Sequence, residues 1–215
     1  SDIFSKISKN NLLLRQKDLS DTLKMIAKNG KNGFYDGLIA KEIVRSVNEY
    51  GGNWSVSDLL AYEIKIRDPI KIGFKNSEII TAPLPSSGGI VMAQVFNILN
   101  KYPLEFINSH EGNHILIEAF KHAFNDRAIF LGDSDFVKIP IHKLLSQSYA
   151  ESKKKKINKD YALPSDDLPS VEYAVSEKEE TTHFSILDSY GNKVSATLSI
   201  NGAFGSGFVA GHTGV

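Results

Sequence analysis

TTHFSIL (residues 181–187) is the most informative part of this sequence. It follows a polar, acidic run, SEKEE (residues 176–180), which shows no apolar periodicity. From Thr181 onward, β-branched and aromatic residues alternate with polar ones, a pattern typical of a β-strand. The predicted strand therefore begins at a threonine, directly after a segment of peptide that a cleavage reaction could reach.

Thr181 is a candidate nucleophile because of this position. Cutting the bond between Glu180 and Thr181 would give Thr181 a free α-amine beside its own hydroxyl group. The amine can then serve as the base for that hydroxyl, which is the threonine–N-terminus arrangement of covalent catalysis. Threonine is also common on water-facing strands that have no chemical role, so the residues alone leave both interpretations open.

A second strand is predicted over residues 194–200, and it forms a hairpin with the first. Val194, Ala196 and Leu198 face one way, whereas Ser195, Thr197 and Ser199 face the other. The connection DSYGN (residues 188–192) is short and contains glycine, as hairpin loops often do.

The register of this hairpin would bring the candidate site together. If Asp188 pairs with Asn192 around a three-residue loop, Thr181 lies directly opposite Ser199, and Asn201 lies diagonally beyond Thr181. Ser199 could then hydrogen-bond the Thr181 hydroxyl, and Asn201 could hold a substrate amide or carboxylate. A slip of one residue would break this arrangement.

Metal and cofactor chemistry is not indicated. His183 shares a face with Thr181 and Ser185, but no second ligand stands at metal-binding spacing, so we expect a structural or supporting histidine. The chain has no cysteine, which excludes a disulfide, a thiolate metal site and a cysteine nucleophile. The sequence implies no metal and no organic cofactor.

Composition excludes several further classes of protein. The 215 residues contain 25 basic and 25 acidic side chains, and this balance argues against a nucleic-acid surface or an acidic-lipid surface. The run KKKK (residues 153–156) is expected to be a solvated helix end. No apolar run is long enough to cross a bilayer.

Upstream of the hairpin the pattern is mainly helical. Periodicity predicts a long helix over about residues 112–131, and alternation predicts strands at Ile64–Ile66 and at residues 70–74 and 78–81. Gly88 and Gly89 follow two serines and could bind an anion at a helix N-terminus, although a tight strand-to-helix turn is favoured. Residues 158–180 lose periodicity and are predicted to be a flexible linker.

Several motifs in this order resemble the gamma-glutamyltransferase (gamma-glutamyl transpeptidase) family of N-terminal-nucleophile hydrolases, over nearly the whole chain. The motifs that carry the resemblance are PLPSSGG (residues 83–89), EAF (118–120), NDR (125–127), LGD (131–133), TTHFS (181–185), GN (191–192), Asn201 and FGSG (204–207).

The resemblance implies a precursor that cuts itself before Thr181 and then acts on glutathione or another gamma-glutamyl compound. Thr181 would form the acyl-enzyme and pass the glutamyl group to water or to an amino acid or peptide acceptor. Ser199 stands where the family usually has a threonine that hydrogen-bonds the nucleophile. Asn201 matches a residue that contacts the substrate's α-amino or α-carboxylate group, and its presence favours a glutamyl-transferring enzyme.

The resemblance also implies a fold class and a domain organisation. We expect an α+β chain, part of a four-layer αββα sandwich, with a mostly helical first part followed by a β-hairpin. Residues 1–157 would be the C-terminal part of a large subunit, residues 158–180 a linker, and residues 181–215 the start of a small subunit.

The remaining part of the same enzyme would be a partner. The family's arginine for the substrate carboxylate would precede Ser1, and its oxyanion-hole residues would follow Val215, so we expect little turnover from this piece alone. A periplasmic or extracellular location is implied by the resemblance only.

Two alternatives remain open. One is a non-catalytic fragment or relative that only binds or assembles. The other is a related acylase or capsule-cleaving enzyme.

Overall fold

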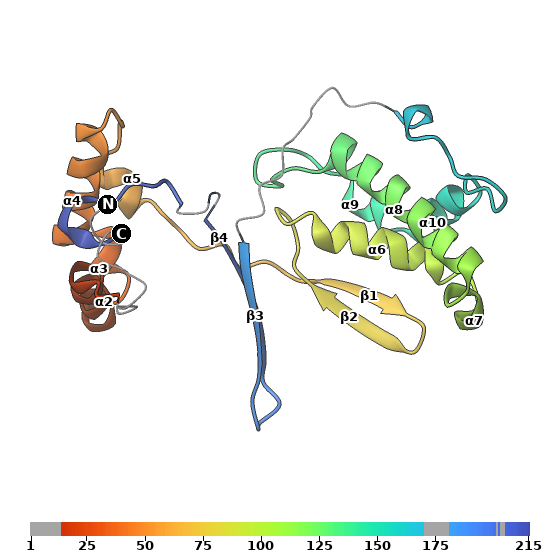
Figure 1. Ribbon diagram of the computed structural model, residues 1–215, viewed down its shortest axis with the longest axis horizontal. Coiled ribbons are helices and arrows are strands. Elements are labelled where there is room, and N and C mark those ends of the chain that lie inside the picture. The colour runs from red at the N-terminus through yellow and green to blue at the C-terminus, as the bar shows by residue number, and fades with distance from the viewer. Residues whose placement is uncertain (1–13, 170–180, 201, 203–204) are drawn as a thin grey trace. The chain divides into compact units, whose positions relative to one another are not determined.

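The chain forms two compact units, of which a computed structural model describes residues 14–169, 181–200, 202 and 205–215. One unit comprises Ser1–Ile64 with Val175–Val215, and the other comprises Lys65–Ala174. Figure 1 labels the helices and strands of both units. Helices dominate the described residues, and the strands form two separate antiparallel pairs. This mixture agrees with the predicted α+β class.

The helices of the first unit are held by local capping. Asp36 accepts a hydrogen bond from the N–H of Gly37, and Ser55 and Asp58 form a reciprocal capping box. The described helices of this unit are α2 (Lys17–Asn29), α3 (Asn32–Tyr35), α4 (Gly37–Glu49) and α5 (Val56–Leu60).

Residues near 213 pack back onto the first helices of this unit. The 3-10 helix η2 (Gly211–Thr213) contacts both α2 and α4. The Thr22 hydroxyl donates a 2.7 Å hydrogen bond to the carbonyl oxygen of Thr213, and both residues are buried. Gly214 has φ +71°, and a Cβ there would overlap the backbone of Leu19. A glycine is therefore needed where the two segments meet.

The second unit begins with a hairpin of β1 (Ile70–Phe74) and β2 (Ser77–Thr81), in which Ile72 pairs with Ile79. The strand predicted at Ile64–Ile66 is wrong. Ile64 and Ile66 are 78% and 93% exposed, and they lie in no strand. Alternation alone does not make a strand, because a strand also needs a neighbouring strand to exchange main-chain hydrogen bonds with.

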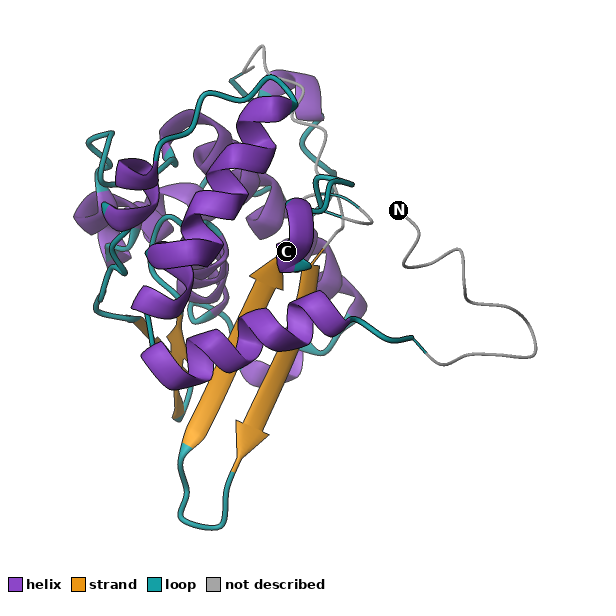
Figure 2. Ribbon diagram, turned by 90° about the vertical axis from the view of Figure 1, so that its left-hand side faces the viewer, coloured by secondary structure: helices purple, strands orange, loops and turns teal. Residues whose placement is uncertain are grey.

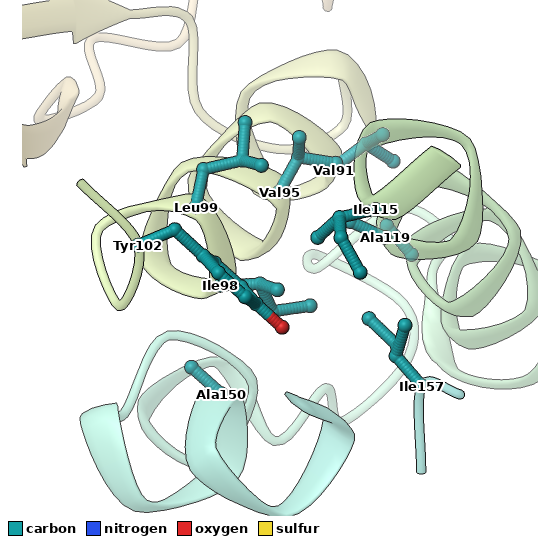
Figure 3. Packing of buried hydrophobic residues seen from close by; sticks show 10 residues of the cluster. Val91, Val95, Ile98, Leu99, Tyr102, Ile115, Ala119, Ala150 and Ile157 are labelled. Atoms are coloured by element: carbon teal, nitrogen blue, oxygen red, sulfur yellow. The ribbon is translucent and has the colours of Figure 1, made fainter. Parts of the chain in front are cut away.

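Helices pack against each other to form the core of this unit. Figure 3 shows the side chains of Val95 and Ile98 gathered with Ile115, Ala119 and the nearby α10 residue Ala150. Its described helices are α6 (Gly88–Leu99), α7 (Leu104–Ile107), α8 (His110–Phe130), α9 (Ile141–Leu144), α10 (Gln147–Lys154) and the 3-10 helix η1 (Ser165–Asp167).

The long helix α8 starts slightly earlier than predicted. Ser109 caps it, because the Ser109 hydroxyl accepts a 3.0 Å hydrogen bond from the N–H of Gly112. Its last residue is Phe130, one residue before the predicted end, and Leu131 is the C-cap. Ile115 and Ala119 on its inner face are almost completely buried.

The predicted linker is partly ordered against α8. Its first part, residues 158–169, contacts α8 through main-chain atoms of Asn158, Leu163 and Pro169. Residues 170–180 lie outside the described part of the chain. The division into residues 1–157, 158–180 and 181–215 depends on the proposed cleavage and stays a prediction.

The expectation of a solvated lysine run is wrong for its first member. The Lys153 side chain is 12% exposed, and its ammonium lies 2.7 Å from Oδ1 of Asp126, whose side chain is 4% exposed. The other oxygen of Asp126 accepts from Gln94, at 2.9 Å. The Tyr149 hydroxyl also donates to Asp126. Burial is the larger cause that raises the pKa of this hydroxyl, and the negative charge of Asp126 raises it further. The lysine run alone did not reveal that Asp126, which is buried on α8, would require a buried cation.

Replacing Lys153 by methionine should therefore destabilise the protein strongly. Lys153→Met leaves the buried Asp126 carboxylate without its cation, which costs about 3–5 kcal/mol of unfolding free energy. Lys155→Met, in the same run but exposed, should change it by less than about 0.5 kcal/mol. Urea unfolding measures both, and equal losses for the two variants would contradict the buried ion pair.

Candidate active site

The candidate site is on the hairpin of β3 (Thr181–Leu187) and β4 (Lys193–Ser199). Figure 2 shows the two strands as adjacent antiparallel arrows joined by a loop. Thr181 pairs with Ser199, and Leu187 pairs with Lys193. The predicted register is therefore confirmed residue for residue.

The turn fixes this register through Asp188. The N–H of Asp188 donates to the carbonyl oxygen of Asn192 at 3.1 Å. In return, Oδ1 of Asp188 accepts from the N–H groups of Tyr190 and Asn192, each at 2.9 Å. Gly191 has φ +84°, which is a left-handed conformation that favours glycine. The loop sequence thus sets which residues face each other along both strands.

Thr181 and Ser199 are brought into hydrogen-bond contact at the start of β3. Their hydroxyl oxygens are 3.0 Å apart, and either oxygen can donate. Both side chains are exposed. An exposed hydroxyl with one fixed neighbour is oriented and still reachable by a reacting group.

A second hydroxyl network surrounds His183 on the same face. Its Nδ1 lies 2.7 Å from the hydroxyl of Thr197. Its Nε2 lies 3.2 Å from Ser185 and 3.1 Å from Ser195. The side-chain alternation predicted that these residues share a face, whereas the cross-strand bonds of His183 appear only in the structure. The His183 ring is therefore held by three hydroxyl groups, and its supporting role stays a prediction.

The opposite face of the hairpin is apolar and faces water within the described residues. Phe184 is 44% exposed, Ile186 54% and Leu198 53%. A face with this alternation normally packs against another layer. The hairpin is therefore built to carry a polar site on one side and a packing surface on the other.

Other predicted site features have different outcomes. Asn201 and Glu180 lie outside the described residues, so their predicted positions stay predictions. At the start of α6, a Cβ on Gly89 would overlap the carbonyl oxygen of Ala82. The Ser87 hydroxyl accepts a 3.0 Å bond from Arg127. These contacts explain the glycine and the serine as parts of a tight turn, the favoured interpretation.

The described residues offer neither a metal-binding cluster nor a membrane-spanning helix. No group of three or more His, Asp or Glu side chains among them could hold a metal ion. None of the described helices combines the length and the apolar character that a membrane crossing requires.

Sequence comparison identifies relatives of the whole chain. The sequence profile of the family Gamma-glutamyltranspeptidase matches residues 3–215. The glutathione hydrolase proenzyme of Escherichia coli (strain K12) is 38% identical over 204 residues. The match covers 94% of this chain and 35% of that protein, so the chain spans about a third of this curated relative.

Solved structures show the same relationship in three dimensions. Gamma-glutamyltranspeptidase of Helicobacter pylori gives a TM-score of 0.70 at 32% identity, covering 77% of this chain and 49% of the other. Cephalosporin acylase from Bacillus halodurans gives 0.78 at 26% identity, covering 94% and 35%. These likenesses confirm the predicted α+β class and its relation to N-terminal-nucleophile hydrolases.

The turn geometry can be tested at Asp188. Asp188→Ala removes the acceptor of the Tyr190 and Asn192 amides, so their hydrogen exchange should accelerate severalfold, whereas Ser189→Ala should leave it unchanged. Hydrogen bonds from Asn192 hold the pKa of Asp188 below its ordinary value of 3.8. The carboxylate therefore supports the turn at pH values above about 3.8, and the support is lost as the pH falls through the lowered value. If the exchange rates of the Tyr190 and Asn192 amides are the same in Asp188→Ala as in the parent, other contacts hold the turn.

Proposed function

The chain belongs to the gamma-glutamyltranspeptidase family, and from this premise we propose that the full-length protein transfers or hydrolyses gamma-glutamyl groups. The donors would be glutathione or similar gamma-glutamyl compounds, and the acceptors would be water, amino acids or peptides. The observation that carries the proposal is the position of Thr181 at the start of β3, with its hydroxyl 3.0 Å from that of Ser199.

The first step would be cleavage of the precursor before Thr181. The Thr181 hydroxyl attacks the carbonyl carbon of Glu180, the C–N bond breaks, and the released amine takes up the proton. Water then hydrolyses the resulting ester and leaves Thr181 with a free α-amine. The name of the E. coli relative includes the word proenzyme, which supports a precursor for this chain as well.

The second use of the same hydroxyl would be catalysis. The α-amine of Thr181 accepts the hydroxyl proton as the oxygen attacks the gamma-carbonyl of the donor. The donor's amine leaves with a proton, and a glutamyl ester remains on Thr181. Water or an acceptor amine then attacks this ester and restores the free threonine. Ser199 would orient the nucleophile in both half-reactions through the hydrogen bond already formed.

Substrate recognition and assembly would involve other parts of the enzyme. Asn201 would contact the α-amino or α-carboxylate group of the glutamyl donor. The exposed apolar face of β3 and β4 would pack against the remaining part of the same protein. A periplasmic or extracellular site of action is proposed from the family relationship.

An acylase is the second candidate function, because the cephalosporin acylase structure covers 94% of this chain. An acylase would use the same threonine on a different acyl group. Full-length protein that hydrolyses a cephalosporin side-chain amide, but no gamma-glutamyl amide, would favour it. A protein that binds gamma-glutamyl compounds without turnover would favour a binding role instead.

Variants of Thr181 test the nucleophile. In the full-length protein, Thr181→Val keeps the β-branched shape but removes the hydroxyl, so both cleavage and hydrolysis of a chromogenic gamma-glutamyl amide should be lost. Thr181→Ser keeps the hydroxyl and should retain both. Intact mass and amide hydrolysis measure the two steps.

Thr182→Val is the matched control, since Thr182 points to the opposite face of β3. It should be cleaved and active. Normal cleavage and turnover in Thr181→Val would rule out the proposed nucleophile.

Variants of Ser199 test its orienting role. Ser199→Ala removes one hydrogen bond to the nucleophile and should lower kcat/KM by about two- to tenfold, the range expected for a net hydrogen bond. Ser199→Thr keeps the hydroxyl and should remain close to the parent. If the cut Ser199→Ala enzyme has full activity, Ser199 does not orient the nucleophile.

A further inference from the structure

A polar stripe follows one side of α8 and is not used by the proposed chemistry. His114, Glu118, Lys121 and Asn125 are spaced by four, three and four residues. This spacing places them on one face of a helix. All four make contacts with residues 158–169, which we call the strap.

The two ends of the stripe hold the two ends of the strap. Nε2 of His114 lies 2.8 Å from the carbonyl oxygen of Asn158. The side-chain amide of Asn125 donates to the carbonyl oxygen of Pro169, also at 2.8 Å. The stripe therefore extends along the whole described length of the strap.

The centre of the stripe holds both main-chain groups of Leu163. The ammonium of Lys121 donates to the Leu163 carbonyl oxygen at 2.7 Å. Oε2 of Glu118 accepts from the Leu163 N–H at 3.3 Å, and Oε1 of Glu118 pairs with Lys121 at 2.8 Å. Glu118 is completely buried. The ion pair thus acts towards Leu163 as a neighbouring strand would, with one donor and one acceptor.

In each of these four hydrogen bonds, the strap atom belongs to the main chain. The hydrogen bonds of the stripe therefore hold the main chain of the strap without reading its side chains. The two contacts to Leu163 at the centre are charge-assisted and partly buried, which makes them stronger than exposed neutral hydrogen bonds. None of the four hydrogen bonds uses an atom beyond Pro169, so a cut before Thr181 removes none of them.

We infer that α8 is a permanent docking surface for the strap, which stays bound to it before and after cleavage. The part of this inference that concerns the cut enzyme rests on the proposed function. In the cut enzyme the strap would anchor the large fragment's new end, because the eleven residues from 170 to 180 can reach at most about 40 Å beyond Pro169. The part of the large fragment beyond this anchor would then begin at residue 170.

Digestion with chymotrypsin can report the state of the strap. Chymotrypsin cuts after tyrosine, and the strap contains the Tyr161–Ala162 bond between its contacts at Asn158 and Leu163. The full-length enzyme, cut and uncut (Thr181→Val), would be digested and followed by intact mass. In both forms, chymotrypsin should cleave the Tyr161–Ala162 bond at least a hundredfold more slowly than in the denatured protein. Fast cutting at Tyr161 in the cut form alone would overturn the inference, because cleavage would then release the strap.

A double variant tests whether the stripe causes the protection. Glu118→Met with Lys121→Met removes both central partners together, so no unpaired charge stays buried. Cutting at Tyr161 should accelerate at least tenfold, whereas Asn113→Leu, exposed on the same helix, should change nothing. Unchanged protection in the double variant contradicts the docking role.

Two further controls keep the outcomes separate. If the double variant fails to fold, the Asn125→Leu variant takes its place, and hydrogen exchange is measured on peptides that cover residues 158–169. We expect faster exchange than in the parent near Pro169. Unchanged exchange contradicts the docking. A parent protein that is never cut contradicts the proposed function, whereas protection of Tyr161–Ala162 in that uncut chain still supports docking.

Discussion

The register of the β3–β4 hairpin is the constraint on which the candidate site depends. Side chains alternate between faces, so a slip of one residue would turn Thr181 away from Ser199 and towards the apolar side. Asp188 prevents this slip by closing the turn on Asn192 from both main chain and side chain. A loop far from the nucleophile along the strand thus decides what the nucleophile touches.

Features determined by neighbouring residues could be predicted from the sequence. The register followed from the turn residues, and the end of α8 at Phe130, within one residue of the predicted position, followed from helical periodicity. The contact of Thr181 with Ser199 followed in turn, because it needs only the register. Asn201 was predicted by the same logic, but it lies outside the described residues.

Features determined by distant residues could not be predicted. The burial of Lys153 depends on Asp126 on another helix, and no local pattern reveals that pairing. The strap contains no periodicity because its main chain, rather than its side chains, makes the bonds to Lys121 and Glu118. The strand predicted at Ile66 is the opposite case. The alternating pattern is present there, but the described residues form no strand at that position.

In the proposed mechanism, the Thr181 hydroxyl carries the acyl group once its own amine is free. The most direct measurement is to react the full-length protein with a gamma-glutamyl electrophile and to map the adduct by peptide mass spectrometry. The account predicts one adduct, on a peptide whose first residue is Thr181. An adduct on any other residue, or on a Thr181 still joined to Glu180, would contradict it.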